Sequence, residues 1–228
     1  MKSHEHLQER VWKRKAQITG KNTRAAEAAK LLPGGKRILD VGCGNGGLVS
    51  YVTGAYQEIY GIDISSTALE KAKKGGMMVK KSDLGEEKIP HGSMYFDAVV
   101  CLDVIDYIRD PEYLIKEIGR VLRSGGIFVI SFPNVRALSR IWSLIVRGRF
   151  PRTSGDTEGY DGGHVHYFTS TDIRHLLEKN GFRVEICKGM LPEGGRAGTT
   201  IRASSRILGN HLSREFVLHG TMIKAVKV

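Results

Sequence analysis

The chain has 228 residues, of which 41% are hydrophobic and 26% are charged. A chain of this length and composition is a soluble globular protein, which excludes the disordered, collagen-like and disulfide-scaffold classes. Its three cysteines form no CxxC pair, so we expect no metal site and a reducing, cytoplasmic location. No apolar run is long enough for a membrane span, and residues 1–20 lack the apolar core of a signal peptide. We therefore expect no integral membrane association.

The formal net charge is +11, and it is unevenly distributed along the chain. Residues 1–37 and residues 134–228 each carry +7, whereas residues 38–133 carry −3. Basic flanks attract acidic ligands, nucleic acid or anionic membrane surfaces. No nucleic-acid recognition motif accompanies them. Nucleic acid is therefore a possible but not a favoured partner, and a solvated basic surface is the simpler interpretation.

Apolar strands and amphipathic helices alternate along the first part of the chain. Strands are predicted at residues 37–41, 58–62, 77–80, 96–102 and 127–132, and helices at residues 23–32, 46–52, 67–74 and 111–124. Thr67 with Glu70 fits a capping box, and Asp110 with Pro111 fits a helix start. Repeated strand–helix units with continuous apolar strands predict a doubly wound α/β sheet.

The pattern changes after Pro133. Apolar residues at helical spacing from Leu138 to Ile145 predict a helix, for which packing on the sheet edge is favoured over contact with a membrane surface. Thr169 with Asp172 predicts a capped helix that ends at Asn180. The remaining elements are predicted as a loop at 147–166, a strand at 182–187, a glycine-rich loop at 189–200, a helix near 201–209 and a final strand at 215–228.

These elements predict one domain over residues 1–228. Its parts are an N-terminal helical flap (1–35), a ligand-binding core (36–133), a lid insertion (134–168) and a segment that completes the sheet (169–228). Open α/β sheets bind ligands at the carboxyl ends of their strands, where the lid is expected. Trp12 either folds over a ligand as part of the flap or packs in the core.

The strongest motif is ILDVGCGNGG at residues 38–47, where the first strand turns toward a helix. Glycines allow a tight turn and a close approach of the backbone to a ligand. The spacing also fits the dinucleotide-binding GxGxxG pattern. However, Asp40 stands two residues before the first glycine, where a carboxylate repels a pyrophosphate and suits a cationic group such as an amino-acid ammonium. A nicotinamide-dependent dehydrogenase is therefore disfavoured.

Further acidic residues follow the next strands. Asp63 ends the second strand, where a carboxylate can accept hydrogen bonds from two ribose hydroxyls. Asp83 follows the third strand and is placed to accept from an adenine amino group, and Asp103 follows the fourth. Because the ends of parallel strands meet at one edge of a sheet, four carboxylates are expected to converge there. Such convergence is costly and points to a ligand.

Together these segments resemble the class I S-adenosylmethionine-dependent methyltransferases. ILDVGCGNGG is similar to their first motif, YGIDIS (60–65) to the acidic second motif, and KSDLGE (81–86) to the third, while residues 96–134 are similar to the fourth and fifth. The match is collinear over about residues 36–133. The resemblance implies a Rossmann-like, mostly parallel seven-stranded sheet with an antiparallel last strand. It also implies S-adenosyl-L-methionine as cofactor and S-adenosyl-L-homocysteine as product.

The resemblance also implies which residues contact the cofactor. The methionine part would lie against Asp40 and the loop of Gly42, Cys43, Gly44, Asn45 and Gly46. The adenosine part would lie against Asp63, Ile64, Ser82, Asp83 and Leu84, and the reactive methyl beside Leu102 and Asp103. Many relatives also carry a Glu-His pair after the fourth strand, but this chain has Asp106 and Tyr107 there. The candidates for a general base are therefore Asp106, Tyr107, His164 and His166.

The predicted function is transfer of a methyl group to a small acceptor, and the basic flanks fit an anionic one. Residues 147–177 also look like the corresponding region of the MetW group of methionine biosynthesis and of related small-molecule methyltransferases. A catalytically silent accessory protein of this fold, which binds the cofactor or only a partner enzyme, is therefore a second hypothesis. An RNA methyltransferase is a third, because of the basic flanks. The sequence does not set the oligomeric state.

Overall fold

The computed structural model describes residues 2–15, 23–154, 160–190 and 218–228. The predicted helix near 201–209, residues 191–200 of the predicted loop and the first residues of the predicted last strand lie outside these ranges.

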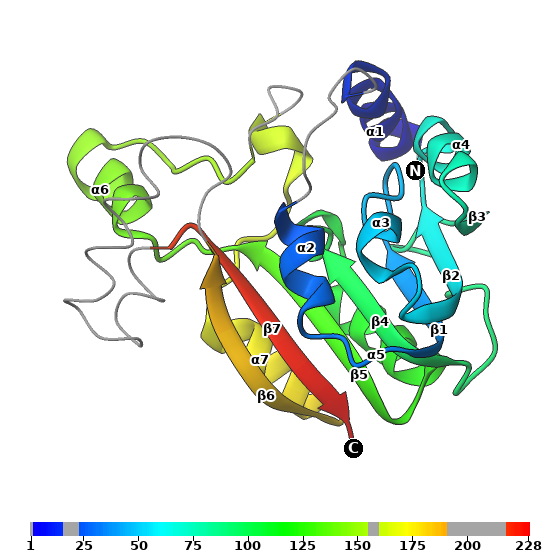
Figure 1. Ribbon diagram of the computed structural model, residues 1–228. Helices are drawn as coiled ribbons and strands as arrows, with labels where there is room; N and C mark the ends of the chain where they lie inside the picture. Colours follow the sequence, from blue (N-terminus) through cyan, green and yellow to red (C-terminus); the bar gives the residue numbers. More distant parts are fainter. Residues whose placement is uncertain (1, 16–22, 155–159, 191–217) are drawn as a thin grey trace.

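Within the described residues, seven strands form one sheet (Figure 1). The strands are β1 (Gly35–Val41), β2 (Tyr56–Asp63), β3 (Met78–Lys81), β4 (Phe96–Leu102), β5 (Leu122–Pro133), β6 (Phe182–Met190) and β7 (Gly220–Lys227). Their order is β3-β2-β1-β4-β5-β7-β6. All pairings from β3 to β5 are parallel, and β7 runs antiparallel to both β5 and β6. The predicted doubly wound, Rossmann-like sheet with an antiparallel last strand is confirmed.

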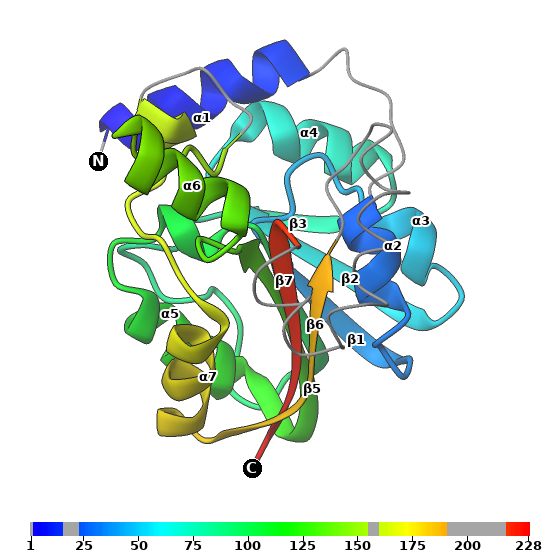
Figure 2. The same ribbon diagram turned by 90° about the vertical axis from the view of Figure 1, so that its left-hand side faces the viewer.

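Helices cover both faces of the sheet (Figure 2). One face carries α2 (Thr23–Ala29), α3 (Val49–Val52) and α4 (Ser66–Lys74), and the other carries α5 (Pro111–Val121) and α7 (Ser170–Lys179). Successive side chains of a strand point to opposite faces, so β4 contributes Val99 to one core and Val100 to the other. The sheet is therefore buried on both sides, as parallel sheets are.

The remaining helical segments lie at the carboxyl ends of the parallel strands. Helix α1 (Lys2–Lys15) lies beside α4, and α6 (Leu138–Arg147) stands at the far side of this edge (Figures 1 and 2). Two short 3₁₀ turns complete the edge, η1 (Ile105–Tyr107) after β4 and η2 (Tyr160–Gly163) in the segment before α7. This edge is where open α/β sheets bind ligands. No helix in the described ranges is both long and apolar enough to cross a bilayer.

Two predicted helix starts are confirmed and one is wrong. The Asp110 carboxylate accepts from the Tyr113 backbone N–H at 2.9 Å, and Thr169 forms the predicted capping box with Asp172. At α4, however, the capping residue is Ser65, whose Oγ accepts from Ala68 N at 3.2 Å. The Thr67–Glu70 capping box does not form, because β2 ends at Asp63 and the chain turns into the helix immediately afterwards.

Several element boundaries also differ from the prediction. The helix predicted at 23–32 ends at Ala29, and the strand predicted at 182–187 continues to Met190, into the predicted loop at 189–200. The helix predicted at 46–52 is reduced to Val49–Val52, because the glycines before it have positive φ angles that are incompatible with a helix. Helix α5 ends at Val121 and β5 begins at Leu122, well before the predicted residue 127. The β4–β5 pairing steps from Phe96↔Leu122 to Ala98↔Ile127, so the extra residues form an irregularity inside the strand.

The prediction that residues 138–145 pack on the sheet edge is wrong. None of the residues of α6 is buried. The helix turns its polar side to the protein: the Arg140 guanidinium donates to the backbone carbonyls of Asn134 and His219, and Ser139 Oγ lies 3.0 Å from His219 Nε2. The apolar side consequently faces outward.

Candidate functional site

The glycine loop between β1 and α3 turns tightly over the end of β2. Gly42, Gly44 and Gly46 have φ angles of +73°, +52° and +79°, which L side chains rarely adopt. A Cβ on Gly42 would lie 2.2 Å from Val104 Cγ2, so only glycine fits there. Asn45, at the tip of the loop, is exposed. The loop thus presents backbone rather than side chains to whatever lies above it.

The loop is tied to Asp63 at the end of β2. Asp63 Oδ2 accepts from Gly44 N at 2.8 Å, and Oδ1 accepts from Ser65 N at 2.9 Å. Burial raises the pKa of Asp63, and these backbone hydrogen bonds oppose that effect. A carboxylate has about four lone-pair sites, and these backbone donors do not use all of them, so Asp63 can still accept from a hydroxyl. The following Ile64 is half-buried.

Asp40 stands on β1 next to the same loop. Its side chain is buried, with 4% exposed, and its pairing partner on β2 is Gly61. Burial, followed by the charge of Asp63, raises the pKa of Asp40 to about 7. A cationic group nearby would restore the ionised form. Cys43 is buried beside both acids, which raises the pKa of its thiol, so Cys43 is a packing residue rather than a nucleophile.

Asp83, the acidic residue after β3, has a hydrogen-bond partner in its own loop. Asp83 is half-buried and accepts from Gly85 N at 3.1 Å, while Ser82 Oγ donates to Glu87 at 3.0 Å. Leu84 lies in the apolar core.

Asp103 has a positive φ of 54°. It accepts from Ser131 Oγ at 2.8 Å and forms an ion pair with Arg24. The preceding Leu102 is half-buried. The four acids thus stand at four successive strand ends along one edge, as the sequence predicted.

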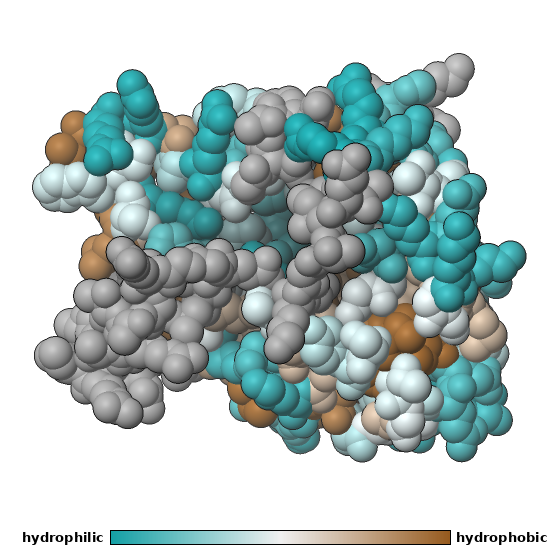
Figure 3. Space-filling view, turned by 45° about the horizontal axis from the view of Figure 1, so that its top comes forward, coloured by the Kyte–Doolittle hydropathy of each residue, from teal (hydrophilic) through white to brown (hydrophobic). Residues whose placement is uncertain are grey.

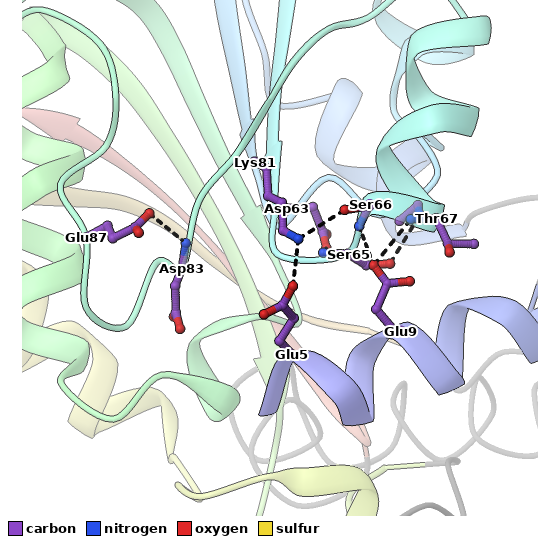
Figure 4. Close-up of polar contacts among 10 residues, drawn as sticks. Glu5, Glu9, Asp63, Ser65, Ser66, Thr67, Lys81, Asp83 and Glu87 are labelled. Carbon is purple, nitrogen blue, oxygen red and sulfur yellow. Dashed lines mark hydrogen bonds and ion pairs between the residues drawn. The ribbon is translucent and has the colours of Figure 1, made fainter. Parts of the chain in front are cut away.

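Helix α1 lies over this edge and is held there by two glutamates (Figure 4). Glu9 accepts from Ser66 N at 2.5 Å and from Thr67 N at 3.4 Å, at the start of α4. Glu5 forms an ion pair with Lys81 at 2.6 Å. A carboxylate at a helix N-terminus satisfies unpaired N–H groups and complements the helix dipole.

Trp12 on α1 lies directly over the glycine loop. A Cβ on Gly44 would lie 2.4 Å from Trp12 Cζ2 and Cη2. The indole therefore covers the loop rather than entering either core. Nearer the middle of the helix, Leu7 contacts η2, since a Cβ on Gly163 would lie 2.6 Å from Leu7 Cδ2. Leu7 and Trp12 are five residues apart, about 7.5 Å along a helix, so α1 contacts both the glycine loop and η2.

Asp106 lies in η1, on the lid side of this edge. It is 1% exposed, and its Oδ2 has no hydrogen-bond partner among the described residues. Burial and the charge of Asp103 raise the pKa of Asp106 well above its ordinary value. The Asp106 carbonyl accepts from Val165 N at 2.8 Å and from His166 N at 3.1 Å, which fixes the segment before α7 to η1.

The structure brings the side chains of His164 and Tyr107 together, whereas the His166 side chain lies against Arg109. The Tyr107 and His164 rings meet edge to face with centroids 4.4 Å apart. His166 instead lies with Nε2 3.2 Å from the carbonyl oxygen of Arg109. A carbonyl only accepts, so His166 carries its proton on Nε2.

Two residues that the sequence analysis missed join His164. Thr153 Oγ1 lies 2.7 Å from His164 Nδ1 and donates to Asp161 Oδ2 at 2.7 Å. Asp161 is buried and has a φ of 49°. Its position in the YDGG stretch, where aspartate and glycine favour left-handed backbone, was the available signal for a built turn.

Known proteins are similar to this chain in both sequence and fold. A family model described as a methyltransferase domain matches residues 9–185. A probable S-adenosylmethionine-dependent methyltransferase of Mycolicibacterium smegmatis is 26% identical over 182 residues, which are 79% of this chain and 65% of that protein. The chain thus spans less than two thirds of that relative's length.

Two further matches cover most of both chains. A ubiquinone biosynthesis O-methyltransferase of Xanthomonas axonopodis pv. citri is 28% identical over 202 residues, which are 82% of this chain and 78% of the relative. The crystal structure of a SAM-dependent methyltransferase from Archaeoglobus fulgidus matches with a TM-score of 0.65 at 19% identity, covering 93% of this chain and 97% of that one. The latter match shows a shared fold.

The residues at the strand edge fit the cofactor of this family. The glycine loop leaves no room for side chains, Asp63 keeps lone pairs for hydroxyl donors, and buried Asp40 suits a cationic ammonium. The family match covers most of the chain and includes all of these residues. The chain therefore belongs to the class I S-adenosylmethionine-dependent methyltransferases.

Proposed function

We propose that this protein transfers a methyl group from S-adenosylmethionine to a hydroxyl oxygen of a small organic acceptor, with His164 as the general base. The observation that carries the proposal is the hydrogen-bonded chain His164–Thr153–Asp161 beside Tyr107, on the same sheet edge as the glycine loop. An O-methyltransferase among the relatives supports the hydroxyl acceptor.

The direction of the hydrogen bonds assigns the imidazole tautomer. Burial raises the pKa of Asp161, but hydrogen bonds from the Thr153 hydroxyl and from the Thr153 and Ser154 backbone outweigh it, so the pKa lies below its ordinary value. Asp161 is therefore ionised and accepts the Thr153 hydroxyl proton. Thr153 Oγ1 in turn accepts from Nδ1 of His164. The second nitrogen, Nε2, carries the lone pair that takes a proton from the acceptor.

The neighbouring groups complement this base. Burial and the charge of Asp103 raise the pKa of Asp106 well above its ordinary value, which favours its uncharged form beside an acceptor that loses a proton. Asp161 stabilises the imidazolium that forms on His164. Deprotonation of a hydroxyl makes it a stronger nucleophile toward carbon, and a positioned base contributes about 10²- to 10⁴-fold.

The chain's other residues hold the cofactor and exclude water. When bound, S-adenosylmethionine supplies an electrophilic methyl group and a sulfonium leaving group. Asp63 would bind the ribose hydroxyls and Asp40 the ammonium. Trp12 and α1 cover the loop, which shields the reacting groups from water. The anionic character of the acceptor, predicted from the basic flanks, stays a prediction.

The first experiment is calorimetric titration with S-adenosylmethionine and S-adenosylhomocysteine, with NAD as the control ligand. We expect binding of both adenosyl ligands and none of NAD. Release of S-adenosylhomocysteine is then measured with a panel of phenols, catechols and aliphatic alcohols, and with amines of matched shape. Turnover with amines alone would contradict the hydroxyl acceptor. Absence of adenosyl binding in the folded protein would favour the accessory-protein hypothesis.

A further inference from the structure

Helix α6 exposes an apolar face that nothing in the described structure covers. Leu138, Trp142, Ile145 and Val146 are 54%, 60%, 75% and 55% exposed. At 100° per residue, these four positions share one side of the helix. Figure 3 shows apolar atoms at the left-hand edge of this view, where α6 lies in Figure 1, while hydrophilic side chains cover most of the opposite end.

The apolar face is held outward by the polar face. Arg140 lies on the opposite side of the helix and bonds to the carbonyls of Asn134 and His219, with Ser139 bonded to the His219 ring. These contacts fix α6 to the ends of β5 and β7. A helix that packs on its own core has the reverse arrangement, with the apolar side inward. The outward orientation of the apolar side is therefore set by specific hydrogen bonds of this helix.

The surroundings of this face are basic. Between Glu117 and Asp156 the sequence contains seven arginines and no acidic residue. Three of them, Arg147, Arg149 and Arg152, are exposed directly after the apolar face, and Phe150 stands among them with 45% exposed. An amphipathic helix with tryptophan on its apolar side and arginines beside it binds the interface of an anionic bilayer.

A second copy of the chain fits this surface less well. In a two-fold dimer the same patch meets itself, so the arginines around the apolar face would approach each other. Like charges across an interface oppose association. An anionic lipid surface instead complements both the apolar residues and the arginines.

We propose that α6 and residues 147–152, here called the α6 surface, dock the protein onto an anionic membrane. The apolar side chains enter the boundary between headgroups and acyl chains, and the arginines bind anionic headgroups. Burial lowers the pKa of Arg140, and the nearby charges of Asp161 and Asp106 oppose that effect, so the α6 surface adjoins η1 and η2. Docking would therefore place the side of the strand edge that carries η1 and η2 next to the membrane. The proposal does not depend on which acceptor is methylated.

The test is co-sedimentation of the full chain with vesicles of phosphatidylcholine, with and without phosphatidylserine. We expect binding to the phosphatidylserine vesicles that weakens with added salt. Trp142→Ser with Ile145→Ser, and separately Arg147→Ser with Arg149→Ser, should each reduce binding about 10-fold or more. Lys73→Ser with Lys74→Ser removes the same two charges from the end of α4 and should leave vesicle binding unchanged.

All of the altered side chains are exposed, so the variants should keep the wild-type melting temperature and S-adenosylmethionine affinity. These two readouts separate loss of docking from loss of fold or of the cofactor site. The proposal is overturned if the wild type does not sediment with anionic vesicles, or if the lysine variant loses binding as much as the arginine variant. Light scattering that shows a dimer, dissociated by Trp142→Ser, would assign the surface to a second copy instead.

Discussion

Asp63 and Gly44 are joined by a hydrogen bond of 2.8 Å from the Gly44 backbone N–H to Asp63 Oδ2. This bond couples the acid at the end of β2 to the loop that follows β1. The position of the carboxylate and the shape of the glycine loop are therefore set together, by the pairing of the two strands. A change at Asp63 is expected to affect both.

Asp63→Asn should weaken S-adenosylmethionine binding about 10- to 100-fold. The amide keeps one acceptor oxygen but loses the charge, and each hydrogen bond to a charged group contributes about 1.5–3 kcal/mol. Calorimetry measures the change in Kd. Asp97→Asn is the matched control, because Asp97 accepts from Lys36 and Arg37 N–H groups at the opposite end of the sheet. Equal loss of affinity in both variants would refute the ribose role.

Asp40 makes stability depend on pH. Its pKa is about 7 in the folded protein, against an ordinary value of 3.8, so the folded state binds the extra proton between these values. The free energy of unfolding should therefore fall as pH rises from about 4 to about 7, by at most about 4 kcal/mol. Asp40→Asn removes this contribution.

Urea denaturation at several pH values checks the Asp40 prediction. The wild type should lose stability relative to Asp40→Asn as the pH increases across that range. A constant difference between the two proteins would mean that Asp40 is not protonated in the folded state.

His164→Asn should lower kcat about 100-fold or more, with little change in S-adenosylmethionine affinity, because it removes a proton acceptor and not a cofactor contact. Thr153→Val should lower kcat less, and Thr153→Ser should retain activity because it keeps the hydroxyl that orients the imidazole. His166→Asn is the control, since its Nε2 is bonded to the Arg109 carbonyl. If His166→Asn is the more damaging change, the base has been misassigned.

Gly42→Ala should destabilise the fold by about 3 kcal/mol. The alanine would have to keep the backbone φ of +73°, and its Cβ would lie 2.2 Å from Val104 Cγ2. The change therefore combines backbone strain with overpacking. Gly148→Ala, with a φ of +61° and open space around it, should cost only about 1 kcal/mol.

The Gly42 prediction has an internal check in a double variant. Gly42→Ala with Val104→Ala should be less destabilised than the sum of the two single changes, because the second removes the clash. Strict additivity in chemical denaturation would show that strain alone accounts for the loss.

Glu9→Gln should loosen α1. Glu9 accepts two backbone N–H groups of α4, and the neutral amide complements the helix N-terminus less well. Amide hydrogen exchange of residues 2–15 should become about threefold faster or more, since a capping bond contributes about 1 kcal/mol. Glu70→Gln, an exposed change on α4 itself, should leave exchange in α1 unaltered.

The centre of the sheet was predictable because β4 and the second half of β5 are nearly continuous apolar runs. Residues 96–102 were predicted to the residue, and the caps at Asp110 and Thr169 carry local signals. The α4 cap was misplaced because three hydroxyl residues, Ser65 to Thr67, follow one another. Only the end of β2 decides which of them caps the helix.

The part of the site around η1 and η2 was less predictable. His164, Thr153 and Asp161 meet through a left-handed turn that no periodic pattern encodes. The amphipathic pattern of α6 predicted which residues share a face, but not which face meets solvent. That outcome depends on Arg140 and His219, which lie far apart in the sequence.

The strand order places β7 between β5 and β6, although β6 comes first in the chain. During synthesis β6 therefore leaves the ribosome before β7, its partner strand among the described residues, exists, and the edge of β6 that pairs with β7 stays unpaired until residues 220–227 follow. The half of the sheet that carries the cofactor loop, from β3 to β5, can pair earlier. Premature termination before residue 220 would thus yield a chain in which β3 to β5 can pair. The edges of β5 and β6 that normally pair with β7 would stay open and prone to aggregation.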